Sequence, residues 1–361
     1  MIIVFTSNTR GGIIQFTVQL AKTFQKLGKE CQIMAPEGAL IETEMEHKTI
    51  RYKKVKTFSA KNRDFQETIK QLKTCEPELV FYTDSSIMSM RVLIHSGLEK
   101  RSVVVMHDVY PHVTRERLKT RLVNYTADRL AYSACKKCLE ILLLSESCRN
   151  EYKKRYPNLA EKTLLMRLGA HVPPKGDCLP AELADIRDYY LFFGRIDQYK
   201  GIETLLKAFQ NYRKSDARKL VIAGAGEFSE HEKALLKELP EVILIHRFLD
   251  DGEIGPLYEN ARAVVLPYIE SSQSGVLPIA YHYGKPVIVS KLPGLVENVL
   301  DGETGMVVDS PETLAKAMLQ MDDAQVYEQM QKAVERYYEA EFNWERNLGV
   351  VLEKLDRKGG R

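Results

Sequence analysis

Short apolar runs alternate with helix-length amphipathic segments along this chain, and the alternation occurs twice. This pattern predicts an α/β fold, in which helices cover both faces of a parallel sheet. In the first half, the expected strands are Ile2 to Thr6, Glu30 to Ala35, Leu79 to Thr83, Ser102 to Met106, Leu139 to Leu144 and Leu164 to Leu168. In the second half, they are Tyr189 to Phe193, Leu220 to Ala223, Val242 to His246, Ala263 to Pro267, Pro286 to Val289 and Met306 to Val308.

A breaker-rich stretch separates the two halves. Pro173, Pro174 and Gly176 interrupt helix and strand alike, and 361 residues exceed one typical domain. Helices are expected at 13–26, 201–214, 230–238, 253–261, 275–283 and 311–321, with a last one near the carboxyl end. The expected layout is a domain at 1–172, a hinge at 173–187, a domain at 188–343 and a final helix at about 344–361, which must bury one apolar face.

Several protein classes are excluded by the same sequence. No run approaches the ~18 apolar residues that a membrane-spanning helix needs, and the chain starts without a basic leader, so we expect a cytoplasmic protein. Six cysteines are too few for a disulfide scaffold and are predicted to be reduced. Cys135 and Cys138 have the spacing of a redox or metal pair, but without a second pair nearby they are predicted to be ordinary helix cysteines.

The net charge of +3 is unevenly distributed, with +9 in residues 1–185 and −6 in residues 186–361. A basic amino half favours an anionic partner, such as a phosphate-bearing acceptor or the inner membrane surface, rather than nucleic acid. A solvated charged face is the alternative. The candidate contacts to an anionic acceptor or to lipid headgroups are Arg115, Arg117, Lys119 and Arg121.

Two motifs in the amino half follow expected strands, where ligands of open α/β sheets bind. Gly11 and Gly12 lie between the first strand and a helix, where exposed amide groups suit an anion or a sugar hydroxyl. His107 and Asp108 follow the strand that ends at Met106. The alternatives are a plain tight turn for the glycines and a histidine bonded to local backbone.

In the carboxyl half, Gly194 and Arg195 follow an expected strand and Lys200 precedes the next helix. An arginine fork and a lysine point charge together neutralise a diphosphate. The chain has no D-x-D triplet that could hold a divalent ion for the same purpose. We therefore expect no metal at this site.

A second loop in the carboxyl half joins the expected strand ending at Pro267 to a helix. Ser274, Gly275 and Val276 would direct backbone N–H groups and the positive end of the helix dipole at a diphosphate. Glu270 offers a carboxylate to sugar hydroxyls. A structural helix cap is the alternative.

The order of these motifs resembles the large retaining glycosyltransferase family 4, which has the GT-B fold of two Rossmann-like parallel-sheet domains facing a central cleft. The resemblance covers nearly the whole chain and is strongest from about 190 to 310. The motifs are Gly11-Gly12, His107-Asp108, Arg167 to Ala170, Gly194-Arg195, Lys200-Gly201, Ala223 to Gly226, Ser274 to Val276, Gly284 to Val287 and Gly302 to Gly305.

The resemblance implies that the carboxyl domain binds a nucleotide-sugar donor, a UDP- or GDP-sugar, and that the amino domain binds an acceptor. By this likeness, Arg195, Lys200 and the amides of Ser274 to Val276 hold the diphosphate, and His107 contacts the donor sugar. It implies no cofactor besides the donor. It also implies that the carboxyl-terminal helix crosses back onto the amino domain.

The chain departs from the family pattern of two glutamates eight positions apart. Aligning on Gly275 puts Ser272 at the first position and Ala280 at the second, which would hold the ribose. Glu270 replaces the first glutamate if the loop is shifted. Either Glu297 holds the ribose in place of the second glutamate, or the affinity for the donor is reduced.

The function implied is transfer of a sugar, with retention, to a hydroxyl of a glycan or polyprenyl-linked glycan in cell-envelope polysaccharide synthesis. A nucleotide-sugar epimerase or a phosphorylase on the same fold is one alternative. A non-catalytic sugar-nucleotide-binding protein is the other, because of the missing glutamate.

Overall fold

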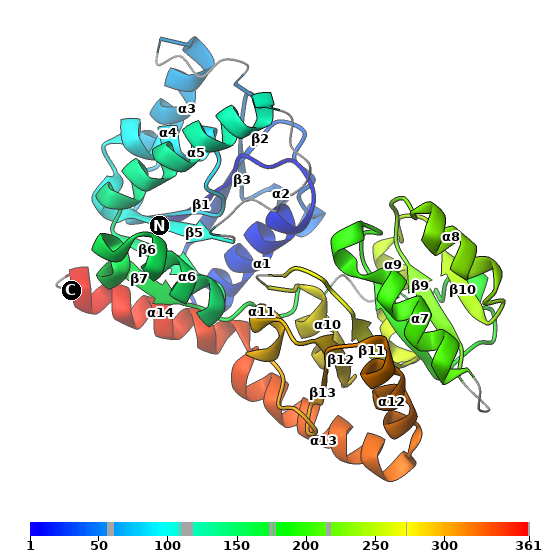
Figure 1. The fold of residues 1–361 in the computed structure, drawn as a ribbon. Coiled ribbons are helices and arrows are strands. Elements are labelled where there is room, and N and C mark those ends of the chain that lie inside the picture. Colours follow the sequence, from blue (N-terminus) through cyan, green and yellow to red (C-terminus); the bar gives the residue numbers. More distant parts are fainter. Residues whose placement is uncertain are drawn as a thin grey trace. The chain divides into compact units, whose positions relative to one another are not determined.

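The structure is a computed structural model that describes residues 1–55, 61–107, 109, 118–172, 176, 178–213, 218–271 and 273–359, with the backbone alone for 118–124 and 359. The chain divides into two compact units. The amino unit consists of Met1–Arg167 and Trp344–Arg361, and the carboxyl unit consists of Leu168–Asn343 (Figure 1).

The described part of the amino unit contains seven parallel strands in the order β3-β2-β1-β4-β5-β6-β7. The strands are β1 (Ile2–Phe5), β2 (Cys31–Pro36), β3 (Thr49–Tyr52), β4 (Leu79–Tyr82), β5 (Ser102–Met106), β6 (Glu140–Leu143) and β7 (Thr163–Leu165). The helices are α1 (Gly12–Lys26), α2 (Thr43–Glu46), α3 (Arg63–Thr74), α4 (Ile87–Ser96), α5 (Leu118–Lys137), α6 (Glu146–Arg155) and α14 (Trp344–Gly359), with 3-10 turns η1 (Glu99–Arg101) and η2 (Pro157–Lys162).

The described part of the carboxyl unit contains six parallel strands in the order β10-β9-β8-β11-β12-β13. They are β8 (Tyr189–Phe193), β9 (Leu220–Ala223), β10 (Val242–Ile245), β11 (Ala261–Leu266), β12 (Val287–Ser290) and β13 (Gly305–Val308). The helices are α7 (Ile202–Tyr212), α8 (Glu230–Lys237), α9 (Asp251–Glu259), α10 (Val276–His282), α11 (Pro293–Val296), α12 (Pro311–Asp322) and α13 (Ala324–Glu341), with 3-10 turns η3 (Ala181–Leu183) and η4 (Gln198–Lys200). The predicted α/β class with two Rossmann-like parallel sheets is confirmed.

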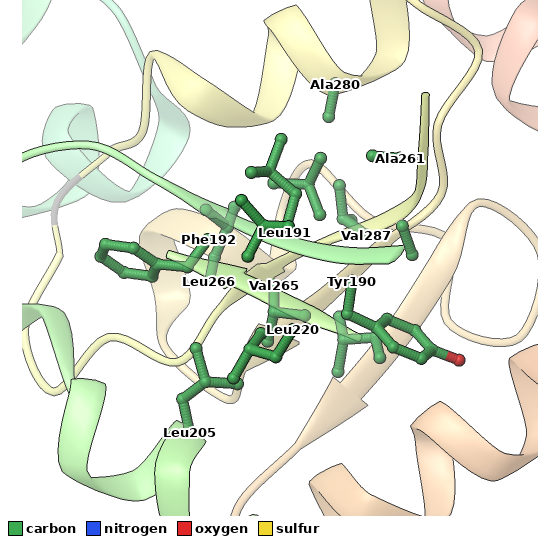
Figure 2. Packing of buried hydrophobic residues seen from close by; sticks show 14 of the residues in the cluster. Tyr190, Leu191, Phe192, Leu205, Leu220, Ala261, Val265, Leu266, Ala280 and Val287 are labelled. Atoms are coloured by element: carbon green, nitrogen blue, oxygen red, sulfur yellow. The ribbon is translucent and has the colours of Figure 1, made fainter. Parts of the chain in front are cut away.

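The central strands are buried on both faces, which is why they stand out in the sequence as apolar runs. Every residue of β5 and of β11 is buried, because helices cover both faces of a parallel sheet. Figure 2 shows the core of the carboxyl unit, where side chains of β8 and β11 such as Leu191 and Val265 pack with Leu205 of α7 and Ala280 of α10.

The final helix α14 belongs to the amino unit, where it packs against α1. Leu348, Val351 and Leu355 are buried along one stripe of α14. The ring centroids of Trp344 in α14 and Phe16 in α1 lie 5.6 Å apart. The apolar face noted in the sequence is therefore covered within the amino unit.

Cys135 and Cys138 are buried at the end of α5, and Cys138 Sγ donates to the carbonyl oxygens of Cys135 and Glu140 at 3.3 Å each. Among the described residues, no group of three or more His, Cys, Asp or Glu side chains is placed to hold a metal ion. The same part of the chain contains no helix that is both long and apolar enough to cross a membrane.

Candidate functional site

The carboxyl ends of β9, β8 and β11 lie side by side because these strands are neighbours in the sheet. Gly194 follows β8, and its N–H donates to the Ala223 carbonyl at the end of β9 at 3.0 Å. A Cβ at Gly224 would lie 1.9 Å from the Gly194 oxygen, and Gly224 has φ of +150°. Glycine at 224 thus permits the contact that carries Arg195 to this edge.

The turn η4 is fixed against the loop that follows β11. The Ile269 N–H donates to the Tyr199 carbonyl at 2.8 Å. Gly201, with φ of +67°, approaches so closely that a Cβ there would lie 1.8 Å from the Pro267 oxygen. These backbone contacts set the position of Lys200, which lies between Tyr199 and Gly201.

Lys200 lies over an aromatic ring at this junction. Its Nζ is 3.7 Å from the centroid of the Tyr268 ring and 5.0 Å from that of Tyr199. Burial, and secondly the positive charge of Arg195, lower the pKa of Lys200 to about 8. A partly desolvated ammonium on a ring face is poorly hydrated, so an incoming anion gains more from it than from an exposed lysine.

Arg195 is more exposed, with 66% of its side chain accessible, and it pairs with Asp197 at 3.0 Å. Exposed pairs of this kind contribute only ~0.2–1 kcal/mol. The guanidinium can therefore turn to a ligand at little cost. Arg195 Cζ and Lys200 Nζ lie 5.9 Å and 5.0 Å from the centroid of the same Tyr199 ring, so the structure brings these two cations together.

The loop between β11 and α10 carries the predicted anion-binding residues Ser274, Gly275 and Val276. Gly275 is the N-cap of α10, and the Val276 N–H donates to Ser274 Oγ at 3.3 Å. Ser271 Oγ donates to the Gln273 carbonyl at 2.7 Å, which closes the loop.

The structure describes one of the two positions at which the family pattern has a glutamate. Ala280 is fully buried in the core of the carboxyl unit, so position 280 offers no carboxylate to a ligand. Glu270 is exposed and directly follows Ile269, which contacts η4. Glu297 is half-buried at the end of α11, in a different loop, and Ser272 lies outside the described residues.

Two features of this edge are not indicated by the sequence. Tyr268 lies under Lys200, and the only sequence signal for it was its place two residues after a buried strand. A pocket of about 270 Å³ lies at the same edge, bounded by α7, the β11 loop and the ends of β12 and β13. Its polar lining residues include Thr204, Ser290 and Ser310.

In the amino unit, Gly11 is the N-cap of α1 with φ of 86°, and both Gly11 and Gly12 are exposed. Gly11 itself supplies no side-chain cap to α1, and the first turn of α1 has no acidic residue. Its amino end therefore retains the positive dipole that suits an anion or a hydroxyl.

His107 follows β5, two strands from β1 in the sheet, so it lies at the same carboxyl edge as Gly11 and Gly12. Its Nε2 is 3.0 Å from the Thr83 carbonyl, and because a carbonyl only accepts, Nε2 carries the proton. The Phe16 ring packs edge-on against the imidazole at 5.1 Å between centroids. The backbone bond foreseen as the alternative is present, and it also orients the ring.

The basic run is only partly visible in the structure. Arg115 and Arg117 lie outside the described residues, as does Asp108. Lys119 and Arg121 belong to α5, whose side chains are not described there. Contact of this run with an anionic acceptor or with lipid stays a prediction.

Part of the chain matches a known family in sequence. Residues 187–323 match the family described as Glycosyl transferases group 1. The D-inositol 3-phosphate glycosyltransferase of Corynebacterium diphtheriae is 34% identical over 46% of this chain and 40% of its own length. The lipopolysaccharide 1,2-N-acetylglucosaminetransferase of Salmonella typhimurium is 25% identical over 59% of this chain and 61% of its own length. The matched region thus spans less than half of the first of these relatives.

Solved structures match nearly the whole chain in fold. Sucrose-phosphate synthase from Thermosynechococcus elongatus has a TM-score of 0.72 at 20% identity, covering 98% of both chains. Anabaena HepE in complex with UDP has a TM-score of 0.74 at 15% identity, covering 99% of both. The chain therefore has the GT-B fold, and its residues 187–323 match the family of glycosyl transferases group 1.

Proposed function

We propose that this protein is a glycosyltransferase that moves a sugar from a nucleoside-diphosphate sugar to a hydroxyl of an acceptor, with retention at the anomeric carbon. The observation that carries the proposal is the pair of cations at the end of β8, in which Lys200 lies on the Tyr268 ring beside Arg195. The match of residues 187–323 to a glycosyltransferase family supports it.

The role proposed for Arg195 and Lys200 follows from where negative charge develops during sugar transfer. When the bond between the anomeric carbon and the diphosphate breaks, negative charge grows on the diphosphate oxygens. Arg195 and Lys200 stabilise that charge more in the transition state than in the ground state, which is the condition for accelerating a reaction. The amides of Ser274 to Val276 would add to this stabilisation, and no metal or cofactor is required.

The donor is proposed to be a UDP- or GDP-sugar. Solved neighbours of the same fold were obtained with UDP and with UDP-glucose, which supports a nucleotide-sugar donor. We assign Glu270 to the donor sugar hydroxyls and Glu297 as the alternative ligand of the ribose. His107 is assigned to the donor sugar, and the backbone amides of Gly11 and Gly12 are assigned to the donor diphosphate.

The acceptor is proposed to be a glycan or a polyprenyl-linked glycan, received by the amino unit at the cytoplasmic face of the membrane during cell-envelope polysaccharide synthesis. The net charge of +9 on residues 1–185 supports an acceptor that carries anionic groups. The likeness to a lipopolysaccharide N-acetylglucosaminetransferase supports the same setting.

A donor panel tests the proposal. Purified protein is incubated with UDP- and GDP-sugars, with and without glycan acceptors, and release of the nucleoside diphosphate is measured in buffer containing EDTA and in buffer containing Mg²⁺. We expect acceptor-stimulated release that survives EDTA. Epimerisation without acceptor, phosphate-dependent sugar release, or loss of turnover in EDTA with rescue by Mg²⁺ contradicts the proposal.

One observation favours a different function. The buried Ala280 cannot supply the second glutamate of the family pattern, so a protein that binds sugar nucleotides without turnover is the second candidate. Saturable binding of a sugar nucleotide by calorimetry, with no release under any acceptor condition, would support that candidate instead.

A further inference from the structure

A buried carboxylate organises the loop between β1 and α1. Asp84 lies two residues after the end of β4 and is 4% exposed. Its Oδ2 accepts from the Ser7 N–H at 2.8 Å and from Thr6 Oγ1 at 3.2 Å. Its Oδ1 accepts from Ser7 Oγ at 3.0 Å, from the Ser86 N–H at 3.0 Å and from Ser89 Oγ at 2.7 Å.

The arrangement requires a carboxylate rather than another polar group. Five donors converge on two oxygens, and only an ionised carboxylate accepts at both oxygens without donating. Within the described part of the chain, Asp84 has no ion pair, so these donors supply its stabilisation in place of water. Two of the five come from Ser7, which lies in the loop that leads to Gly11.

The same loop is fixed from its other side. The Leu40 N–H, after β2, donates to the Thr9 carbonyl at 2.8 Å. Tyr52 Oη, at the end of β3, donates to the Thr6 carbonyl at 2.8 Å. The loop is thus held between the ends of β2 and β3 on one side and Asp84 on the other, while Gly11 remains exposed.

Thr83, the residue before Asp84, holds His107, which is the other candidate site residue of the amino unit. The Thr83 carbonyl accepts from His107 Nε2 at 3.0 Å, and Thr83 Oγ1 is 2.7 Å from Thr17 Oγ1 of α1. Consecutive residues at the end of β4 therefore orient both the loop carrying Gly11 and the imidazole of His107.

We propose that Asp84 is a positioning residue that keeps the loop from Ser7 to Gly12 in its ligand-ready conformation before any ligand binds. The inference rests on the proposed function, in which this loop contacts the donor diphosphate. Pre-ordering lowers the entropic cost of binding, so its loss appears in the affinity for the donor.

Asp84→Asn tests the proposal because it keeps the size of the side chain and removes one accepting edge. In either orientation of the asparagine amide, its NH2 group faces hydrogen-bond donors. When the NH2 group takes the place of Oδ2, the Ser7 N–H loses its acceptor. We expect amide hydrogen exchange in a peptide spanning residues 6–12 to accelerate at least ~10-fold in the ligand-free protein, with β5 unchanged.

Thr68→Val is the matched control. Thr68 is 1% exposed in α3, and its Oγ1 donates to the Asp64 carbonyl at 2.8 Å, away from the loop. It removes a buried hydrogen bond of the same unit and should leave exchange at residues 6–12 unchanged. If Asp84→Asn does not fold, Ser89→Ala removes one donor to Asp84, and we expect a smaller acceleration at the same peptide.

Steady-state kinetics separate a positioning role from a general loss of stability, because a general loss of stability does not change the donor KM. Since the substituted enzyme must order its loop on binding, the donor KM should rise about 10-fold with kcat within about 3-fold of the wild type. Unchanged exchange at residues 6–12, or equal acceleration throughout the amino unit, overturns the role of Asp84. If hydrogen exchange in Asp84→Asn accelerates as expected but the wild-type protein turns over no sugar nucleotide, Asp84 is still the loop anchor and only the proposed function is overturned.

Discussion

Lys200 Nζ lies 3.7 Å from the centroid of the Tyr268 ring, at the point where the turn η4 meets the loop after β11. The ring face attracts the ammonium, while burial removes part of its hydration and lowers its pKa to about 8. The charge is therefore held in place before a ligand arrives.

Arg195→Ala and Lys200→Ala should each lower the turnover of the donor by about 10²–10³-fold, since each removes a group that stabilises the leaving diphosphate. Arg195 is exposed and Lys200 is half-buried, so each substitution should change the free energy of unfolding much less than it changes the activation free energy of the reaction. Steady-state kinetics and urea unfolding check the two effects. The control is Lys207→Ala, which removes an exposed lysine paired with Glu203 on α7. Normal activity in a folded double variant would refute the assignment.

Affinity for UDP or GDP should fall as the pH rises through about 8, because Lys200 is charged below its pKa of about 8 and neutral above it. A bound diphosphate favours the charged form and shifts the midpoint upward. Calorimetric titrations between pH 6.5 and 9.5 measure the effect. Lys200→Arg remains charged throughout this range and should abolish the dependence. An identical fall in that variant would assign the titration to another group.

Gly201→Ala should weaken both folding and nucleotide binding. Alanine at a φ of +67° costs roughly 1–2 kcal/mol, and the new Cβ would lie 1.8 Å from the Pro267 oxygen, so the loop carrying Tyr268 must shift. Gly302→Ala is the control, because φ there is +80° and no atom lies within 4 Å of the added Cβ. Chemical unfolding and calorimetry should find a larger stability loss at 201 and a loss of nucleotide affinity only there.

The basic run should promote reversible binding to anionic membranes. Each basic residue near such a surface contributes about 1 kcal/mol, and the attraction fades within ~8 Å at physiological salt. Co-sedimentation with vesicles should rise with phosphatidylserine content and fall with added salt. The test variant neutralises Arg115, Arg117, Lys119 and Arg121 together and should sediment less.

Four exposed lysines elsewhere in the amino unit give a variant of equal charge change for this experiment. They are Lys29, Lys70, Lys73 and Lys100. Neutralising them should reduce sedimentation much less. Equal sedimentation of the wild type with neutral and anionic vesicles at low salt would exclude the membrane contact and leave the transferase proposal intact.

The sequence by itself determined the two parallel sheets, because a strand buried on both faces must be an uninterrupted apolar run, as Val103 to Val105 in β5 are. It did not indicate β3, where Thr49, Ile50 and Arg51 are half-exposed. An edge strand pairs on one side only, so its residues need not be continuously apolar.

The sequence also selected Arg195, Lys200 and His107, since each follows a predicted strand at the edge where parallel sheets bind ligands. What lies against them was decided by the tertiary structure. The ring under Lys200 comes from another strand end, and its distance depends on the close approach of Gly201 to Pro267. Asp84 and Ser7 are likewise 77 positions apart and meet only because β1 and β4 pair in register. Such contacts depend on strand order and register, which no local pattern of residues specifies.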